Sequence, residues 1–274
     1  MKIKKIFLIS RPIFWIWTVG AYLIGIGNFN NFEFLSIIEF LFMFVPINFI
    51  IYGLNDIYDI KSDEINPEKD KLQGTALKKT EIREVKKIAT ILSILFVFIA
   101  IIIGRLEHMI FSIGIILLAI IYSVPPIRLK SKPILDSIFG SIGYLFPILL
   151  AFTTHNTLSN IPWEYSILVL PMIGNHAIST LRDISCDKKS GTKTIGVFLG
   201  KRKTLILSFI LYVIPLFFIQ NIFLISVIVS SSFFILITSF TDLKKEKYIF
   251  PLISALFLVL NLTFIYFILK FNLG

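Results

Sequence analysis

The sequence predicts an all-α membrane protein that crosses the bilayer nine times. Of its 274 residues, 56% are hydrophobic, only 16% are charged, and 28 are Phe. Soluble domains carry about a quarter charged residues. Long apolar segments cross a bilayer as helices, because the backbone must satisfy its own hydrogen bonds in hydrocarbon. The composition therefore favours a multi-spanning helical protein over a soluble one.

Nine apolar segments approach the length of about 20 residues that a spanning helix needs. The first follows a basic start, "MKIKK", but Arg11 and Pro12 interrupt the pattern of a signal peptide and no small-residue cleavage site follows. We therefore expect this segment to be the first membrane helix. Short polar breaks separate most of the others. The predicted helices cover residues 10–27, 33–54, 82–104, 108–124, 133–153, 162–182, 203–219, 221–240 and 249–270.

The basic residues predict the orientation. All 27 Lys and Arg except Arg105 and Lys270 lie on the side of the N-terminus. Because cytoplasmic loops carry the excess of Lys and Arg, we expect the N-terminus in the cytoplasm and the C-terminus on the opposite side of the cell membrane. The net charge of +10 then reflects topology and attraction to lipid, and we expect no nucleic-acid partner. His108 and His155 fall in loops on the opposite side, and we assign them no role.

Acidic residues gather in two cytoplasmic loops. "YGLNDIYDIKSDEINPEKDK" opens the loop predicted over residues 55–81, and "LRDISCDKKSGTKTIGVFLGKR" spans the loop predicted over residues 182–202. Each cluster directly follows a predicted helix, and the two occupy matching places in the two halves of the chain. The halves are otherwise barely similar, so the repeat is weak.

The spacing of these acids indicates a metal site. Asn55, Asp59 and Asp63 follow one another at intervals of four residues, as do Asp183 and Asp187, so each set lines one face if the preceding helix continues. Stacked like charges repel unless a cation lies between them. Mg²⁺ takes carboxylates together with substrate phosphates. We therefore expect two clusters that hold Mg²⁺ and a diphosphate, although either cluster alone would also suit a solvated helix end.

A diphosphate also needs cationic partners. "YSVPPIRLKSKP" presents Arg128 and Lys130 after a proline pair that ends the preceding helix. Lys69 and Lys71 follow the first acidic cluster. We expect these four side chains to bind phosphate oxygens, the alternative being ordinary positive-inside residues.

Three further polar residues are candidates at or near the membrane. Arg11, at the start of the first helix, could meet the acceptor or phosphate, or serve as a topology anchor. Tyr122 could hydrogen-bond the diphosphate or receive a proton, or be an interface aromatic. His176 precedes Asp183 by seven residues, hence about 10 Å deeper on nearly the same face. It could serve as a base for the acceptor, or be a packing histidine.

Several of these segments occur in the order typical of one family. "SRPIFW", "NDIYDIKSD", "YSVPPIRLK" and "DISCDKKSGTKTIGVFLG" together span nearly the whole chain. They resemble the UbiA superfamily of intramembrane prenyltransferases, with its NxxxDxxxD and DxxxD motifs. One departure is "KDKLQGTALK", where many quinone-pathway members have Arg-Pro-Leu and a later glycine. Lys69 or Lys71 would replace that Arg, or the diphosphate is gripped elsewhere.

The resemblance implies one domain over residues 1–274, with nine helices around a central cavity capped by the two acidic loops. Mg²⁺ would bridge the five motif residues to an isoprenyl diphosphate, and the departing diphosphate would leave an allylic carbocation for a hydrophobic acceptor to attack. The cavity would exclude water. The implied catalytic residues are Asp59, Asp63, Asp183 and Asp187, with Tyr122 added as a candidate.

Within the superfamily, "KSKPILDS" and "NHAISTLRDISCD" look most like the lycopene elongases, which add a five-carbon unit from dimethylallyl diphosphate to a carotenoid. A quinone-precursor or archaeal ether-lipid prenyltransferase is the alternative. Among other classes, a CDP-alcohol phosphotransferase needs a DG signature that Ile57 breaks after Asp56. A transporter would bury charge near the midplane, and a catalytically silent scaffold would release no diphosphate. The sequence makes no prediction of oligomeric state.

Overall fold

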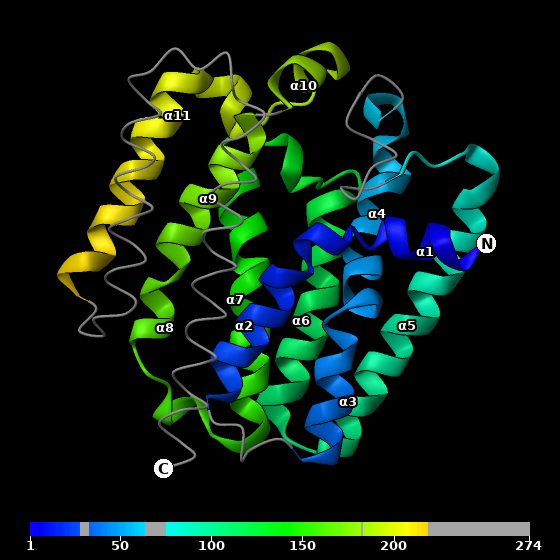
Figure 1. The fold of residues 1–274 in the computed structure, drawn as a ribbon, viewed down its shortest axis with the longest axis vertical. Helices are drawn as coiled ribbons and strands as arrows, with labels where there is room; N and C mark the ends of the chain where they lie inside the picture. The colour runs from blue at the N-terminus through cyan, green and yellow to red at the C-terminus, as the bar shows by residue number, and fades with distance from the viewer. Residues whose placement is uncertain (28–32, 64–74, 182, 219–274) are drawn as a thin grey trace. The chain divides into compact units, whose positions relative to one another are not determined.

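The structure, a computed structural model, describes residues 1–27, 33–63, 75–181 and 183–218. All the regular secondary structure within these ranges is helical, as predicted (Figure 1). The chain forms two compact units, which are Met1–Leu129 with Gly143–Ile161 and Lys130–Ile142 with Pro162–Gly274. The helices predicted over residues 221–240 and 249–270 lie outside the described ranges.

The helices follow in an order close to the predicted one. The α-helices are α1 (Ile3–Ile9), α2 (Trp15–Ile26), α3 (Phe34–Phe42), α4 (Val45–Asp63), α5 (Ile82–Ile103), α6 (Leu106–Ser123), α7 (Leu135–His155), α8 (Glu164–Ile167), α9 (Val169–Leu181), α10 (Ile184–Ser190) and α11 (Ile195–Val213). Short 3-10 helices are η1 (Pro12–Phe14), η3 (Lys79–Glu81), η4 (Leu129–Ser131), η5 (Leu158–Asn160) and η6 (Ile214–Phe217).

Four segments of the described chain are long and apolar enough to cross a membrane. They are Phe34–Ile60, Lys79–Ile103, Leu106–Ser123 and Leu135–His155. These agree with the predicted helices at residues 33–54, 82–104, 108–124 and 133–153. The count of spans in the described ranges is therefore smaller than nine, and α2 is a shorter apolar helix.

The first predicted helix is interrupted in the first unit. The prediction was a continuous helix over residues 10–27, whereas α1 ends at Ile9 and α2 begins at Trp15. Arg11, which precedes Pro12, has a left-handed backbone with φ 49°, a conformation that a non-glycine residue seldom adopts. The Trp15 indole donates to the Ser10 carbonyl at 3.0 Å, which stabilises the corner.

A second break separates α3 from α4. Pro46 has no N–H to continue the hydrogen bonds of α3. Side chains take over the carbonyls left at the break: Thr18 Oγ1 donates to Met43 O at 2.7 Å, and Asn48 Nδ2 donates to both Met43 O and Phe44 O. These bonds let a backbone interruption sit inside an apolar unit.

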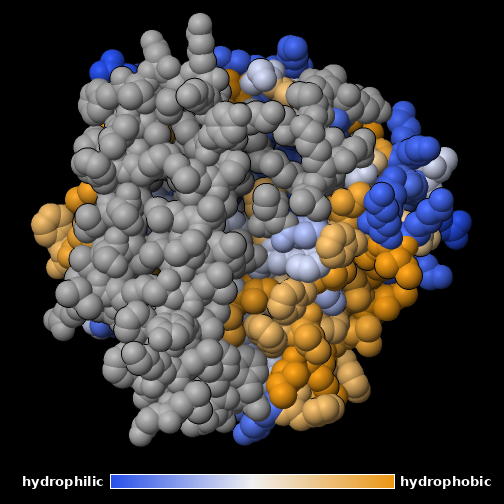
Figure 2. Space-filling model, viewed as in Figure 1, coloured by the Kyte–Doolittle hydropathy of each residue, from blue (hydrophilic) through white to orange (hydrophobic). Residues whose placement is uncertain are grey.

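The first unit is apolar inside and apolar on its flank. Its main core includes Tyr22 from α2, Ile47 and Ile50 from α4, and Phe96 from α5. The outer side of α5 exposes Ile91, Ile94, Leu95, Phe98, Ile101 and Ile102. In Figure 2, an apolar surface lies over the described part of this flank, and hydrophilic residues gather toward α1 and the start of α5. An integral membrane protein presents such a surface to lipid.

In the second unit, α9 and α11 pack closely. A Cβ added at Gly174 would lie 3.1 Å from the Ser208 carbonyl oxygen, and Ser208 Oγ donates to Gly174 O at 2.9 Å. Small residues allow this approach between helices in a membrane. Two predictions were wrong here. The loop over residues 182–202 is largely helical, and the helix predicted at 203–219 begins instead at Ile195, with a kink at Gly200, and ends at Val213.

Candidate active site

The first acidic motif occupies the last turns of α4 in the first unit. Because α4 continues to Asp63, the start of the loop predicted at residue 55 is helical, and Asn55, Asp59 and Asp63 follow one another on successive turns of one face. Asp59 is 5% exposed and Asp63 is 8% exposed. Carboxylates shielded to this degree interact more strongly with a cation than carboxylates in water do.

Arg128 reaches this motif from the turn after α6. Its Nη2 donates to Asp59 Oδ1 at 2.9 Å. The Arg128 backbone has φ 38°, in the left-handed region, and its N–H donates to Val124 O. A non-glycine residue seldom adopts this conformation, and such strain concentrates at functional sites. The turn thus places Arg128, a predicted diphosphate-binding residue, beside Asp59, a predicted metal ligand.

A second arginine pairs with the same helix. Arg11 Nη2 donates to Asp56 Oδ1 at 2.5 Å, and the Asp56 side chain is fully buried. The guanidinium also lies over the Tyr52 ring, 4.6 Å from its centroid, and the Tyr52 and Tyr144 hydroxyls are 3.3 Å apart. Asp56 was not predicted as the partner of Arg11. The available signal was an intramembrane arginine, which requires an acid nearby.

The remaining predicted residues of the first unit are partly described. Tyr122 lies on the last turn of α6, near Tyr52. It therefore belongs to the surroundings of Arg11. Lys69 and Lys71 lie outside the described residues.

The second acidic motif has a different local structure from the first. The prediction placed Asp183 and Asp187 on a continuation of the preceding helix, but α9 ends at Leu181 and Asp183 is the N-cap residue of the separate short helix α10. The four-residue spacing still forms one helical turn, because Asp187 N–H donates to Asp183 O at 2.8 Å. Thr194 Oγ1 donates to Asp187 Oδ2 at 3.1 Å.

His176 and Lys130 both lie in the second unit, near one another. The imidazole packs on Gly140 of α7, where an added Cβ would approach Nε2 to 2.4 Å. His176 Nδ1 is 3.3 Å from Ser137 Oγ. These contacts support the interpretation of His176 as a packing histidine. Its role as a base for the acceptor stays a prediction.

The chemistry of these side chains fits a hard divalent cation. Each motif supplies two carboxylates one helical turn apart, and the first adds the amide oxygen of Asn55. Within the described ranges, no group of three or more His, Cys, Asp or Glu side chains is gathered closely enough to hold a metal.

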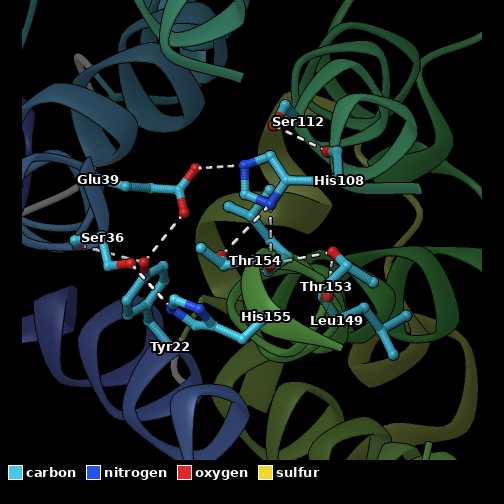
Figure 3. Close-up of polar contacts among 10 residues, drawn as sticks. Tyr22, Ser36, Glu39, His108, Ser112, Leu149, Thr153, Thr154 and His155 are labelled. Carbon is cyan, nitrogen blue, oxygen red and sulfur yellow. Dashed lines mark hydrogen bonds and ion pairs between the residues drawn. The ribbon is translucent and has the colours of Figure 1, made fainter. Parts of the chain in front are cut away.

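A separate polar cluster lies in the first unit around Glu39 of α3 (Figure 3). Glu39 is fully buried, with Oε1 2.9 Å from His108 Nε2 and Oε2 accepting from the Tyr22 hydroxyl at 3.0 Å. His108 Nδ1 is 3.0 Å from Leu150 O. His155 Nε2 is 3.2 Å from Ser36 Oγ.

This cluster corrects the placement of two histidines. His108 lies within α6 and His155 is the last residue of α7, so neither is in a loop. Glu39 inside an apolar run was the signal for the cluster, because a charge within a membrane segment needs a partner. Both carboxylate oxygens of Glu39 have protein partners, so the cluster joins α2, α3, α6 and α7.

The fold and these sites define an all-helical integral membrane protein with a carboxylate motif at the end of a spanning helix. The chain belongs to the UbiA prenyltransferase family, which residues 13–247 match. It is therefore an enzyme of prenyl transfer, and the resemblance inferred from the motifs is confirmed. The family assignment also decides against the phosphotransferase, transporter and scaffold alternatives.

Two groups of known proteins are similar to this chain. Proteins named lycopene elongase/hydratase from Corynebacterium glutamicum and Halobacterium salinarum are each 29% identical, over 219 and 213 residues. They match 78% and 74% of this chain and 75% and 74% of their own. A UbiA homologue from Archaeoglobus fulgidus, solved with DMAPP and Mg²⁺, has a TM-score of 0.70 at 20% identity and covers 94% of this chain and 98% of its own.

Proposed function

We propose that this enzyme transfers the dimethylallyl group of dimethylallyl diphosphate to the end of a carotenoid, with Mg²⁺ as its metal. The names of its relatives support the carotenoid acceptor, and the ligands of its structural neighbour support the donor and the metal. The observation in the chain itself that carries the proposal is the row of oxygen ligands on α4, paired with Arg128.

The two acidic motifs would hold the metal jointly. Asn55, Asp59 and Asp63 would contribute from α4, and Asp183 and Asp187 from α10. Bound Mg²⁺ would neutralise the charge that develops on the departing diphosphate. Hard oxygen ligands together with substrate phosphates are the coordination that this ion prefers.

The basic side chains would bind the diphosphate and the apolar helices would protect the cation. Arg128 and Lys130 would donate charge-assisted hydrogen bonds to phosphate oxygens, with Lys69 or Lys71 as further donors. Tyr122 would donate to the diphosphate or receive a proton at its hydroxyl oxygen. The surrounding apolar side chains would exclude water, so that the acceptor and not water reacts with the allylic cation.

Arg11 and His176 would line the pocket that binds the acceptor.

We also propose that residues 1–274 form one domain of nine membrane helices. The excess of basic residues supports a cell-membrane enzyme with its N-terminus and active site in the cytoplasm and its C-terminus on the opposite side.

Expression in a lycopene-producing host tests this function. Mass spectrometry of the lipid extract should show carotenoids enlarged by one or two five-carbon units. Asp59→Ala and Asp183→Ala should abolish the product while the protein still inserts and folds. Glu33→Ala is the matched control, because this exposed acid lies outside both motifs.

Other acceptors would give different products in the same assay. Unchanged lycopene together with a prenylated quinone precursor or a glycerol ether lipid would overturn the carotenoid acceptor and retain prenyl transfer. Full activity of either Asp variant would overturn the metal assignment.

A further inference from the structure

The segment between the second acidic motif and α11 is tied to Asp187 through both backbone and side chains. Thr192 N–H donates to Asp187 O at 2.9 Å, and Ser190 Oγ donates to the same carbonyl at 3.1 Å. Only Thr194 among these residues is bonded to the carboxylate itself, through Oγ1 to Oδ2 at 3.1 Å. The position of Thr194 therefore bears directly on the orientation of the Asp187 carboxylate.

Thr194 is the N-cap residue of α11, yet its side chain does not cap that helix. A threonine at this position ordinarily accepts a hydrogen bond from one of the first backbone N–H groups. Here the hydroxyl donates to Asp187 instead. The free N–H groups at the start of α11 must then be satisfied by other acceptors.

Two buried side chains from other helices provide these acceptors. Ile195 N–H donates to Asp136 Oδ2 at 2.8 Å, and Gly196 N–H donates to Thr180 Oγ1 at 3.1 Å. Asp136 is fully buried at the start of α7, and a carboxylate suits the positive end of a helix. A Cβ at Gly196 would lie 2.5 Å from Thr180 Oγ1, so the close approach requires glycine.

We propose that Asp136 and Thr194 are positioning residues for the second acidic motif. Asp136 holds the first turn of α11 in place, which fixes Thr194 where its hydroxyl can orient the Asp187 carboxylate for metal binding. The inference rests on the proposed function, because it assumes that Asp187 is a metal ligand. Groups that hydrogen-bond a metal's ligands commonly set its affinity.

Metal binding measured without turnover tests Thr194. Mn²⁺ is the probe, and the electron paramagnetic resonance signal of free Mn²⁺ gives its dissociation constant for the full-length protein in detergent. Thr194→Val keeps the shape and removes the hydroxyl, so it should weaken Mn²⁺ binding about tenfold. Thr194→Ser should restore it, and Ser190→Ala should leave it unchanged, because Ser190 bonds the Asp187 carbonyl rather than its carboxylate.

Kinetics separate positioning from general damage. In Thr194→Val, the Mg²⁺ concentration for half-maximal activity should rise about tenfold, with kcat at saturating Mg²⁺ unchanged. Asp136→Ala should also weaken Mn²⁺ binding, whereas Asp136→Asn, which keeps an oxygen acceptor for Ile195 N–H, should bind more tightly than Asp136→Ala. If Asp136→Ala fails to fold, the Thr194 series still decides the matter.

The outcomes distinguish the inference from the function on which it rests. Equal Mn²⁺ affinity in wild type and Thr194→Val would overturn the positioning role and leave the proposed function intact. A wild-type protein that binds no Mn²⁺, with or without dimethylallyl diphosphate, would overturn both.

Discussion

Arg128 Nη2 lies 2.9 Å from Asp59 Oδ1, so a predicted diphosphate ligand and a predicted metal ligand form an ion pair. Asp59 is 5% exposed at its side chain and Arg128 is 29% exposed. The guanidinium thus occupies one oxygen of a carboxylate that we propose to bind Mg²⁺. On donor binding, Arg128 would pass to the diphosphate, whose phosphate groups can accept two of its N–H hydrogen bonds.

Replacement of Arg128 should therefore separate donor binding from metal binding. Arg128→Ala should raise the donor KM about tenfold, the effect of losing about 1.4 kcal/mol in one charge-assisted hydrogen bond. Binding of Mn²⁺ in the absence of donor should not weaken, because a competing cation is removed. Steady-state kinetics measure the donor KM, and Mn²⁺ titration measures metal binding. An unchanged donor KM would contradict the assignment.

The pair formed by Arg11 and Asp56 should be a major source of stability. Removal of one partner of a buried ion pair costs about 3–5 kcal/mol, because the other charge is left buried without it. Arg11→Leu should lower the unfolding temperature in detergent strongly. The double variant Arg11→Leu with Asp56→Leu should recover part of the loss.

The pair between Lys5 and Glu81 serves as the control for this experiment. Each of its side chains is 22% exposed, so Lys5→Ala should cost no more than about 1 kcal/mol. If Arg11→Leu were no more destabilising than Lys5→Ala, the Arg11 pair would have no special structural role.

Gly140 should be intolerant of any side chain. A Cβ there would lie 2.4 Å from His176 Nε2, and such overpacking typically costs about 1–3 kcal/mol. Gly140→Ala should lower the unfolding temperature, and His176→Ala in the same chain should relieve the clash. Gly143→Ala is the matched control on α7, because its Cβ would meet Leu118 at an ordinary 3.6 Å. Equal effects of the two Gly substitutions would refute the predicted contact.

The cluster of Glu39 and His108 should stabilise the fold without serving the reaction. Glu39 lies in α3 and Asp59 near the end of α4, so 20 residues of the candidate span Phe34–Ile60 separate them. His108→Ala should cost about 1–3 kcal/mol, because it leaves a buried oxygen of Glu39 without its hydrogen-bond partner. Glu39→Gln, which keeps an oxygen for the Tyr22 hydroxyl, should cost about 1–3 kcal/mol.

Mg²⁺ dependence should be the same in Glu39→Gln as in wild type. Unfolding temperatures and the Mg²⁺ concentration for half-maximal activity are the two measurements. A Glu39→Gln enzyme of normal stability but altered Mg²⁺ dependence would show that the cluster acts on the reaction.

Sequence patterns predicted the apolar helices well and the ends of elements less well. The spans at α5, α6 and α7 follow from hydropathy alone, because a bilayer dictates both their length and their composition. The helix predicted over residues 33–54 was too short at its end, because α4 runs through Asp63, and the four-residue spacing of the acids had suggested this continuation only as a condition. The same spacing misled at Asp183, because an i to i+4 pattern fits one short helix as well as the continuation of a longer one.

The contacts that complete the site were beyond sequence reasoning. Arg11 was predicted to meet the acceptor or phosphate, but its bond to Asp56 joins residues 45 positions apart. The bond from Ile195 to Asp136 spans 59 positions. Such pairings depend on how helices pack, and a single sequence carries no signal for them beyond the rule that a buried charge needs a partner.

The central claim is that Asp59 and Asp63 share bound metal with Asp183 and Asp187. The most direct test is the anomalous diffraction of Mn²⁺ in crystals grown with an unreactive analogue of dimethylallyl diphosphate. We predict metal peaks at coordination distance, roughly 2 Å, from carboxylates of both motifs and bridged by the diphosphate. Metal bound at one motif alone, or diphosphate bound away from both, would contradict the account.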